Sequence, residues 1–197
     1  MSHYYAMQQL VRSLEEAITG RPLHGSRKNG YFHYIPHDER LFLEGLEEAI
    51  KLLKKTRVGV YGAKFCDVGC GIGSKLILAE TKLLRVTGIE FDKKLAKVAE
   101  GMLKGFGRAG KVIVGDALKQ SYKDYDLIYY YRPISDLAPM QQLREEILST
   151  MHDDALVLSG TGCAVEVMDK HEYKEHVDSY ARINHPHHRS MEPLGNA

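Results

Sequence analysis

A strand-like segment that runs into three alternating glycines constrains this chain more than any other feature. The sequence Phe65-Cys66-Asp67-Val68-Gly69-Cys70-Gly71-Ile72-Gly73 begins with the apolar pattern of a buried strand, and an amphipathic segment follows it. Glycine adopts backbone conformations that other residues avoid, so the glycines predict a tight turn from a strand into a helix. Such a turn leaves backbone groups exposed at the end of a strand, where a ligand can approach them.

From Lys64 onward, segments with the pattern of a strand alternate with segments with the pattern of a helix. The strands are expected over residues 64–68, 86–90, 111–114, 126–131 and 155–159, with two more short edge strands over 165–168 and 179–183. The helices are expected over residues 74–84, 92–106 and 136–151. This alternation predicts an α/β fold with an open, mostly parallel twisted sheet and helices on both faces.

The flanking segments predict the domain organisation. Apolar spacing predicts two helices, over residues 4–19 and 38–55, which we interpret as an N-terminal helical cap covering residues 1–60. The main domain is then expected over 61–184, and 185–197 form a flexible tail without periodicity. The aromatic and histidine-rich segment 31–38 either folds over the site as a lid, where it would offer a base or a substrate contact, or simply joins the two helices.

Composition excludes several classes of protein. The chain has 27 basic and 26 acidic residues, and this balance argues against strong electrostatic binding to nucleic acid. No apolar run approaches the length of a membrane span, and the first residues do not resemble a signal peptide. The three cysteines, Cys66, Cys70 and Cys163, fit a reduced cytoplasmic protein, and no metal site is expected because no second ligand pair has suitable spacing.

Acidic residues stand at the ends of the next two expected strands. Glu90 lies 21 residues beyond Gly69, and Asp116 follows the strand over 111–114. A carboxylate at the position of Glu90 can accept hydrogen bonds from both ribose hydroxyls of a nucleoside. A carboxylate at the position of Asp116 can accept a hydrogen bond from the exocyclic amine of an adenine. The alternatives are a solvated charge for Glu90 and a helix cap for Asp116. In order and spacing, the two acids predict a nucleoside site.

The ordered set Asp67-x-Gly69-x-Gly71-x-Gly73, Glu90 and Gly115-Asp116-Ala117 resembles the motifs of class I S-adenosylmethionine (SAM)-dependent methyltransferases over residues 64–160. The resemblance implies a Rossmann-like domain, SAM as cofactor, S-adenosylhomocysteine as product and methyltransferase activity. It also implies roles for individual residues. The methionine part of SAM would contact Asp67, Gly69, Cys70, Gly71 and Gly73, while Glu90 would hold the ribose, Phe91 would pack on the adenine, and Asp116 and Ala117 would bind its amine and ring.

Two alternative functions remain open at this point. A dehydrogenase usually carries Gly-x-Gly-x-x-Gly beside a pyrophosphate, whereas this turn has an acidic residue, Asp67, two positions before its first glycine. A carboxylate there suits the cationic amino group of SAM, so the turn favours SAM over a dinucleotide. The second alternative is a SAM-binding regulatory or partner module without catalysis.

The sequence Tyr129-Tyr130-Tyr131-Arg132-Pro133 ends the strand over 126–131, where methyltransferases often place their chemistry. Tyr130 and Tyr131 are candidates to contact the sulfonium or a substrate, because aromatic faces attract cations. Arg132 can hold a carboxylate or a phosphate with two hydrogen bonds. Alternatively, the tyrosines pack against helices, and strand alternation lets only one of them face the site. The Asn/Asp-Pro-Pro-aromatic pattern of amino-base methyltransferases is absent, so a small-molecule or protein acceptor is favoured over a nucleic-acid base. The oligomeric state is not predicted.

Overall fold

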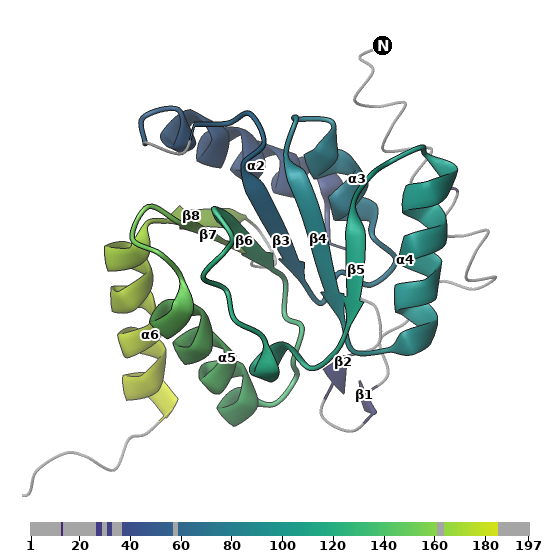
Figure 1. The fold of residues 1–197 in the computed structure, drawn as a ribbon. Coiled ribbons are helices and arrows are strands. Elements are labelled where there is room, and N and C mark those ends of the chain that lie inside the picture. Colours follow the sequence, from purple (N-terminus) through teal and green to yellow (C-terminus); the bar gives the residue numbers. More distant parts are fainter. Residues whose placement is uncertain are drawn as a thin grey trace, which may run out of the picture.

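The computed structural model describes residues 13, 27–28, 31–32, 37–56, 59–160 and 164–184. Among these residues, six strands form one sheet in the order β5-β4-β3-β6-β7-β8 (Figure 1). The strands are β3 (Lys64–Val68), β4 (Arg85–Glu90), β5 (Lys111–Val114), β6 (Leu127–Tyr130), β7 (Leu156–Gly160) and β8 (Val165–Met168). All neighbours pair in parallel except β7 and β8, which are antiparallel. The predicted open, mostly parallel sheet is therefore confirmed.

Helices cover both faces of this sheet, as the strand and helix alternation predicted. One face carries α2 (Glu39–Leu53), α3 (Ser74–Glu80) and α4 (Lys93–Gly105), whose inner side chains share one apolar cluster. The other face carries α5 (Leu137–Thr150), α6 (Lys170–Asn184) and the short 3-10 helix η1 (Ala117–Lys119) over a second cluster. The fold is thus an α/β three-layer sandwich of the Rossmann-like type.

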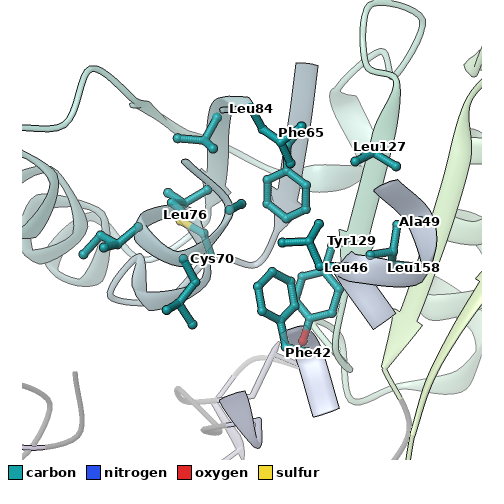
Figure 2. Packing of buried hydrophobic residues seen from close by; sticks show 14 of the residues in the cluster. Phe42, Leu46, Ala49, Phe65, Cys70, Leu76, Leu84, Leu127, Tyr129 and Leu158 are labelled. Atoms are coloured by element: carbon teal, nitrogen blue, oxygen red, sulfur yellow. The ribbon is translucent and has the colours of Figure 1, made fainter. Parts of the chain in front are cut away.

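Helix α2 forms part of the main core rather than lying apart from it. Asp38 caps this helix, and its Oδ1 accepts hydrogen bonds from the N–H groups of Arg40 and Leu41 at 2.8 and 3.2 Å. Figure 2 shows the Phe42 ring beside the rings of Phe65 and Tyr129, with centroids 6.1 and 4.8 Å away. Burying an aromatic side chain of this kind contributes about 1.5–3 kcal/mol. The predicted domain boundary near residue 60 stays a prediction.

The predicted strand over 179–183 is wrong, because these residues lie within α6. The start of α6 explains the difference: Asp169 Oδ1 accepts hydrogen bonds from the N–H groups of His171 and Glu172, while Glu172 Oε2 accepts one from the N–H of Asp169. This reciprocal capping box starts a helix, and Tyr173 and Val177 then bury one helical face.

Two further findings concern the end of α3 and the residues ahead of α2. Helix α3 ends at Glu80, before the predicted residue 84, and the chain then turns through Leu83 with φ 68°. Ahead of α2, β1 (Arg27–Lys28) pairs antiparallel with β2 (Tyr31–Phe32). The helix predicted over 4–19 lies outside the described residues except for Ser13, which is helical, and the predicted tail 185–197 lies outside them altogether.

Candidate functional site

The order of the strands reverses between β3 and β6. From β3 the chain builds outward through β4 and β5, and it then returns to add β6 on the other side of β3. In open parallel sheets, ligands bind at the carboxyl ends of the strands next to such a reversal. The β3–α3 turn begins there, and Val68 of β3 is in register with Tyr130 of β6. The topology therefore brings the glycine turn and the Tyr130–Arg132 segment to the same edge.

The glycine turn has the sharp geometry that the sequence predicted. Gly69, Gly71 and Gly73 have φ values of 79°, 55° and 83°, in the left-handed region that glycine occupies most easily. A Cβ atom on Gly69 would lie 2.7 Å from the Cβ of Pro133, and one on Gly73 would lie 3.1 Å from the Cβ of Ala99. These two glycines therefore let the β6–α5 connection and α4 come close to the turn, in addition to shaping its backbone.

Glu90 fastens the glycine turn to the end of β4. Its Oε2 accepts a hydrogen bond from the N–H of Gly71 at 2.8 Å, and its Oε1 accepts one from the N–H of Asp92 at 2.8 Å. The side chain is almost fully buried, and burial raises its pKa despite these two bonds. A carboxylate oxygen can accept more than one hydrogen bond, so the same group retains acceptor capacity for ribose hydroxyls.

Asp67 places a second carboxylate beside the turn. It is buried, and burial raises its pKa to about 7, while the Lys75 ammonium lowers this pKa and the Glu90 carboxylate raises it. Two buried carboxylates next to one ammonium leave a region that favours a further cation. The positive sulfonium and ammonium groups of SAM fit such a region, whereas the phosphates of a dinucleotide do not.

Cys70 contributes to the turn mainly through its backbone. Its N–H donates to the carbonyl oxygen of Ile89 at 3.0 Å, and the side chain is buried against β4, where a Cβ on Gly88 would lie 2.5 Å from the Cys70 Sγ. Burial raises the pKa of this thiol well above its usual value. The contact predicted between Cys70 and the cofactor stays a prediction.

Exposed apolar side chains lie beside the glycine turn, at the carboxyl ends of β4 and β5. Phe91, predicted to pack on an adenine, is 50% exposed, and Val114 at the end of β5 is 46% exposed. Since Glu90 and Val114 are in register, both apolar side chains stand at the carboxyl ends of neighbouring strands. A flat apolar ring such as adenine fits this surface. The sequence analysis missed Val114, because only the structure shows that this strand residue is exposed.

Asp116 and Ala117 follow directly after β5. Asp116 Oδ1 accepts a hydrogen bond from the N–H of Leu118 at 3.0 Å, so the side chain caps η1. This is the helix-cap alternative that the sequence left open, and the contact with an adenine amine stays a prediction. The Ala117 carbonyl oxygen accepts a hydrogen bond from the Tyr122 hydroxyl at 2.8 Å, which fixes this connection.

The three consecutive tyrosines of β6 have different surroundings. Tyr129 packs on the α2 face, and its hydroxyl shares a hydrogen bond of 2.9 Å with His37 Nδ1. Tyr130 packs on the opposite face with its ring centroid 6.5 Å from that of Tyr173, and it is buried. Tyr131 stacks on the His37 ring, with centroids 4.1 Å apart. This packing favours a structural role for Tyr130 and leaves Tyr131 as the better candidate for a substrate contact.

Arg132 combines an exposed side chain with an unusual backbone conformation. Its φ is 44°, in the left-handed region that costs a residue with a Cβ about 1–2 kcal/mol. Backbone strain of this kind concentrates at functional sites. The next residue, Pro133, is the one that touches Gly69. The geometry therefore supports, without testing, the predicted role of Arg132 in substrate binding.

His37 reaches this edge from the candidate lid segment 31–38, whereas the sequence analysis did not single out Lys75. His37, in the candidate lid segment, is buried, and its carbonyl oxygen accepts a hydrogen bond from Lys75 Nζ at 2.8 Å. Lys75 Nζ also lies 3.1 Å from Glu39 Oε1. Among the described residues, no group of three His, Cys, Asp or Glu side chains is arranged to bind a metal ion. None of the helices that the structure describes has the length and apolarity of a membrane span.

Comparison with known proteins agrees with this geometry. Residues 66–158 match the family model of the methyltransferase domain. The PH0226 protein of Pyrococcus horikoshii OT3 has a similar structure, with 23% identity and a TM-score of 0.50 over 63% of this chain and 58% of that one. An RNA methyltransferase of Salinibacter ruber in complex with S-adenosyl-L-homocysteine is also similar, with 23% identity and a TM-score of 0.53 over 64% of this chain and 76% of that one.

These comparisons show a methyltransferase domain within the chain and the fold of that domain. The fold is that of a Rossmann-like methyltransferase domain, and the family model covers the strands and turns that carry the candidate site. Residues 66–158 thus carry a methyltransferase domain with a Rossmann-like fold, and no subfamily is assigned. The chain spans less than two thirds of the length of the Pyrococcus protein. No protein with a curated description matches the sequence.

Proposed function

We propose that this protein transfers the methyl group of SAM to a small-molecule or protein acceptor. The observation that carries the proposal is the convergence of two buried carboxylates, Asp67 and Glu90, on the glycine turn at the strand reversal. The charge and the acceptor groups of this arrangement suit the methionine and ribose parts of SAM. The same edge carries the exposed apolar side chains of Phe91 and Val114, which suit its adenine.

The residues of this chain would orient the cofactor rather than react with it. SAM, when bound, supplies an electrophilic methyl group on its sulfonium. Asp67 would hold the amino group, Glu90 would accept the ribose hydroxyls, and the glycine turn would let the backbone approach the methionine part. Holding a donor and an acceptor in line supplies much of the acceleration of such a transfer. A general base is required only for an acceptor that is protonated at the working pH.

The acceptor would lie beyond the end of β6. Tyr131 stands there as an aromatic surface and Arg132 as an exposed cation with a strained backbone. A guanidinium in this position suits an acceptor that carries a carboxylate. The absence of the Asn/Asp-Pro-Pro-aromatic pattern and the net charge of +1 support a small molecule or a protein over a nucleic-acid base. The buried thiols of Cys66 and Cys70, both free, support a cytoplasmic location.

Calorimetry with SAM, S-adenosylhomocysteine and NAD tests the cofactor. We expect both adenosyl compounds to bind in the micromolar range and NAD not to bind, and an absence of SAM binding at high micromolar concentration would overturn the proposal. Turnover then separates an enzyme from a binding module. We expect S-adenosylhomocysteine to accumulate with at least one acceptor in a panel of small carboxylic acids, phenols, peptides, proteins and RNA. Tight SAM binding without product across this panel would favour the non-catalytic module.

A further inference from the structure

Lys75 occupies a position where a positive charge is not expected. It lies in the first turn of α3, and its side chain is 7% exposed. The positive end of the helix dipole opposes a cation in the first turn, and burial opposes it further. Lys75 is therefore stable there only because other groups compensate for its charge. Those groups come from two different segments of the chain.

The first two partners of Lys75 belong to the start of α2. Its Nζ donates a hydrogen bond to the carbonyl oxygen of His37 at 2.8 Å and forms an ion pair with Glu39 Oε1 at 3.1 Å. Glu39 is itself mostly buried, with 18% of its side chain exposed. The third partner is Asp67 of β3, whose charged form the Lys75 ammonium stabilises. Among the described residues, Glu90 of β4 also acts on Asp67, and its carboxylate disfavours the charged form of Asp67.

His37, held through its carbonyl oxygen, stands at the acceptor end of the site. Its ring stacks on Tyr131, and its Nδ1 shares a hydrogen bond with the Tyr129 hydroxyl. A Cβ on Gly160, the last residue of β7, would lie 3.4 Å from the His37 Cε1. His37 thus covers the carboxyl ends of β6 and β7. One ammonium consequently contacts the segment over the acceptor end and also acts electrostatically on the carboxylate at the cofactor end.

We propose that Lys75 is a positioning residue of this site, whose single ammonium holds His37 in place at the acceptor end and supplies a positive charge to the cofactor end, where Asp67 lies. The proposal rests on the proposed function, because it assigns a role to Lys75 within the same SAM site. Replacing Lys75 leaves Asp67 facing Glu90 without a cation. Asp67 then takes up a proton more readily, and a cofactor ammonium meets a neutral group at neutral pH.

The test compares Lys75→Met with Lys75→Arg and, as the matched control, with Lys51→Met at an exposed lysine of α2. Calorimetry uses S-adenosylhomocysteine, which carries the same amino group as SAM, at about pH 7 and about pH 9. We expect Lys75→Met to weaken binding about fivefold near pH 7 for a rise of one unit in the Asp67 pKa, and to recover to within about twofold near pH 9. Lys75→Arg and Lys51→Met should stay within about twofold of wild type at both pH values. A loss that is equal at both pH values would overturn the proposal, since it would show a purely structural defect.

Two measurements on the unliganded protein separate this proposal from the cofactor assignment. The ¹³C signal of the Asp67 carboxyl should titrate about one unit higher in Lys75→Met than in wild type, and near the wild-type value in Lys75→Arg. The His37 ring signals should shift in Lys75→Met and remain close to wild type in Lys75→Arg. Unchanged Asp67 and His37 signals in a folded Lys75→Met protein would refute the role of Lys75. If these signals change but no adenosyl compound binds, the proposed function is wrong. Lys75 would then still hold His37 and act on Asp67, but only as part of the protein structure.

Discussion

Glu90 Oε2 lies 2.8 Å from the backbone nitrogen of Gly71, a residue that precedes it by 19 positions. The carboxylate expected to hold the ribose thus also holds the middle glycine of the turn that receives the methionine part. Its other oxygen accepts the N–H of Asp92, at the N-cap of α4. The two connections that follow β3 and β4 are therefore joined through one side chain before any cofactor binds.

Replacing Glu90 should weaken both the cofactor site and the fold. Glu90→Ala removes two hydrogen bonds to backbone N–H groups and two acceptors for the ribose. We expect SAM affinity to fall by about 2–4 kcal/mol and the free energy of unfolding to fall by about 1–3 kcal/mol. Glu90→Gln keeps one acceptor oxygen, so its losses should be smaller. Calorimetry with SAM and urea denaturation of the unliganded protein measure the two effects.

The control for this prediction is Glu100→Ala, which removes an exposed carboxylate from α4. This variant should change neither quantity by more than about 0.5 kcal/mol. If Glu90→Ala binds SAM as tightly as wild type, the assignment of Glu90 to the ribose is wrong.

Asp67 should make the unliganded protein less stable as the pH rises. Its folded-state pKa, about 7, lies above the ordinary value of 3.8, so between these values the folded state binds more protons than the unfolded state. Stability attributable to this group therefore falls as the pH rises through that window, by at most about 1.4 kcal/mol per pH unit. Asp67→Asn removes the dependence. We expect the variant to gain stability relative to wild type between about pH 5 and about pH 8, while binding SAM more weakly.

Urea denaturation at these two pH values, with wild type and Asp67→Asn side by side, isolates the contribution of Asp67 because all other groups are shared. A stability difference between the two proteins that is the same at both pH values would show that Asp67 titrates normally. Such a result would also contradict the argument that the buried Asp67 carboxylate favours binding of a cationic group.

The local features of this fold were predictable from the sequence, and the contacts across the sheet were not. Apolar periodicity and three glycines suffice to place β3, the turn and α3, because each depends on neighbouring residues. The capping box of Asp169 and Glu172 is equally local, and reading it would have corrected the strand wrongly predicted over 179–183. In contrast, Lys75 and His37 are 38 residues apart, and no local pattern links them.

The tyrosines of β6 show the same limit. Strand alternation predicts that Tyr129 and Tyr130 face opposite sides, but it does not say which side belongs to which helix. The answer depends on α2 packing on one face and α6 on the other, which brings Phe42 to Tyr129 and Tyr173 to Tyr130. The left-handed conformation of Arg132 likewise has no signal in the sequence, because it follows from how the β6–α5 connection meets the glycine turn.

Gly69 should not tolerate a side chain. With φ 79° and Pro133 only 2.7 Å from the position of a Cβ atom, Gly69→Ala combines an unfavourable backbone conformation with a steric clash. We expect a loss of at least about 2 kcal/mol in the free energy of unfolding. Gly101→Ala is the matched control, since Gly101 lies inside α4, where a Cβ atom would meet no neighbouring atom within 4 Å. It should stabilise the protein by about 0.5–1 kcal/mol. Urea denaturation that ranks the two variants in the opposite order would contradict the geometry of the turn.

Comparing Tyr129→Phe with Tyr130→Phe distinguishes a structural role of each tyrosine hydroxyl from a catalytic one. The Tyr129 hydroxyl bonds to His37 Nδ1 at 2.9 Å, so its removal should cost about 1 kcal/mol of stability. The Tyr130 hydroxyl is buried and has no hydrogen-bond partner among the described residues, so its removal should be neutral or stabilise the protein by up to about 1 kcal/mol. Thermal and urea denaturation measure both changes, and SAM affinity should be unaffected in Tyr130→Phe. Once an acceptor is found, a tenfold or greater loss of turnover in Tyr130→Phe with normal stability would instead support a catalytic role for its hydroxyl.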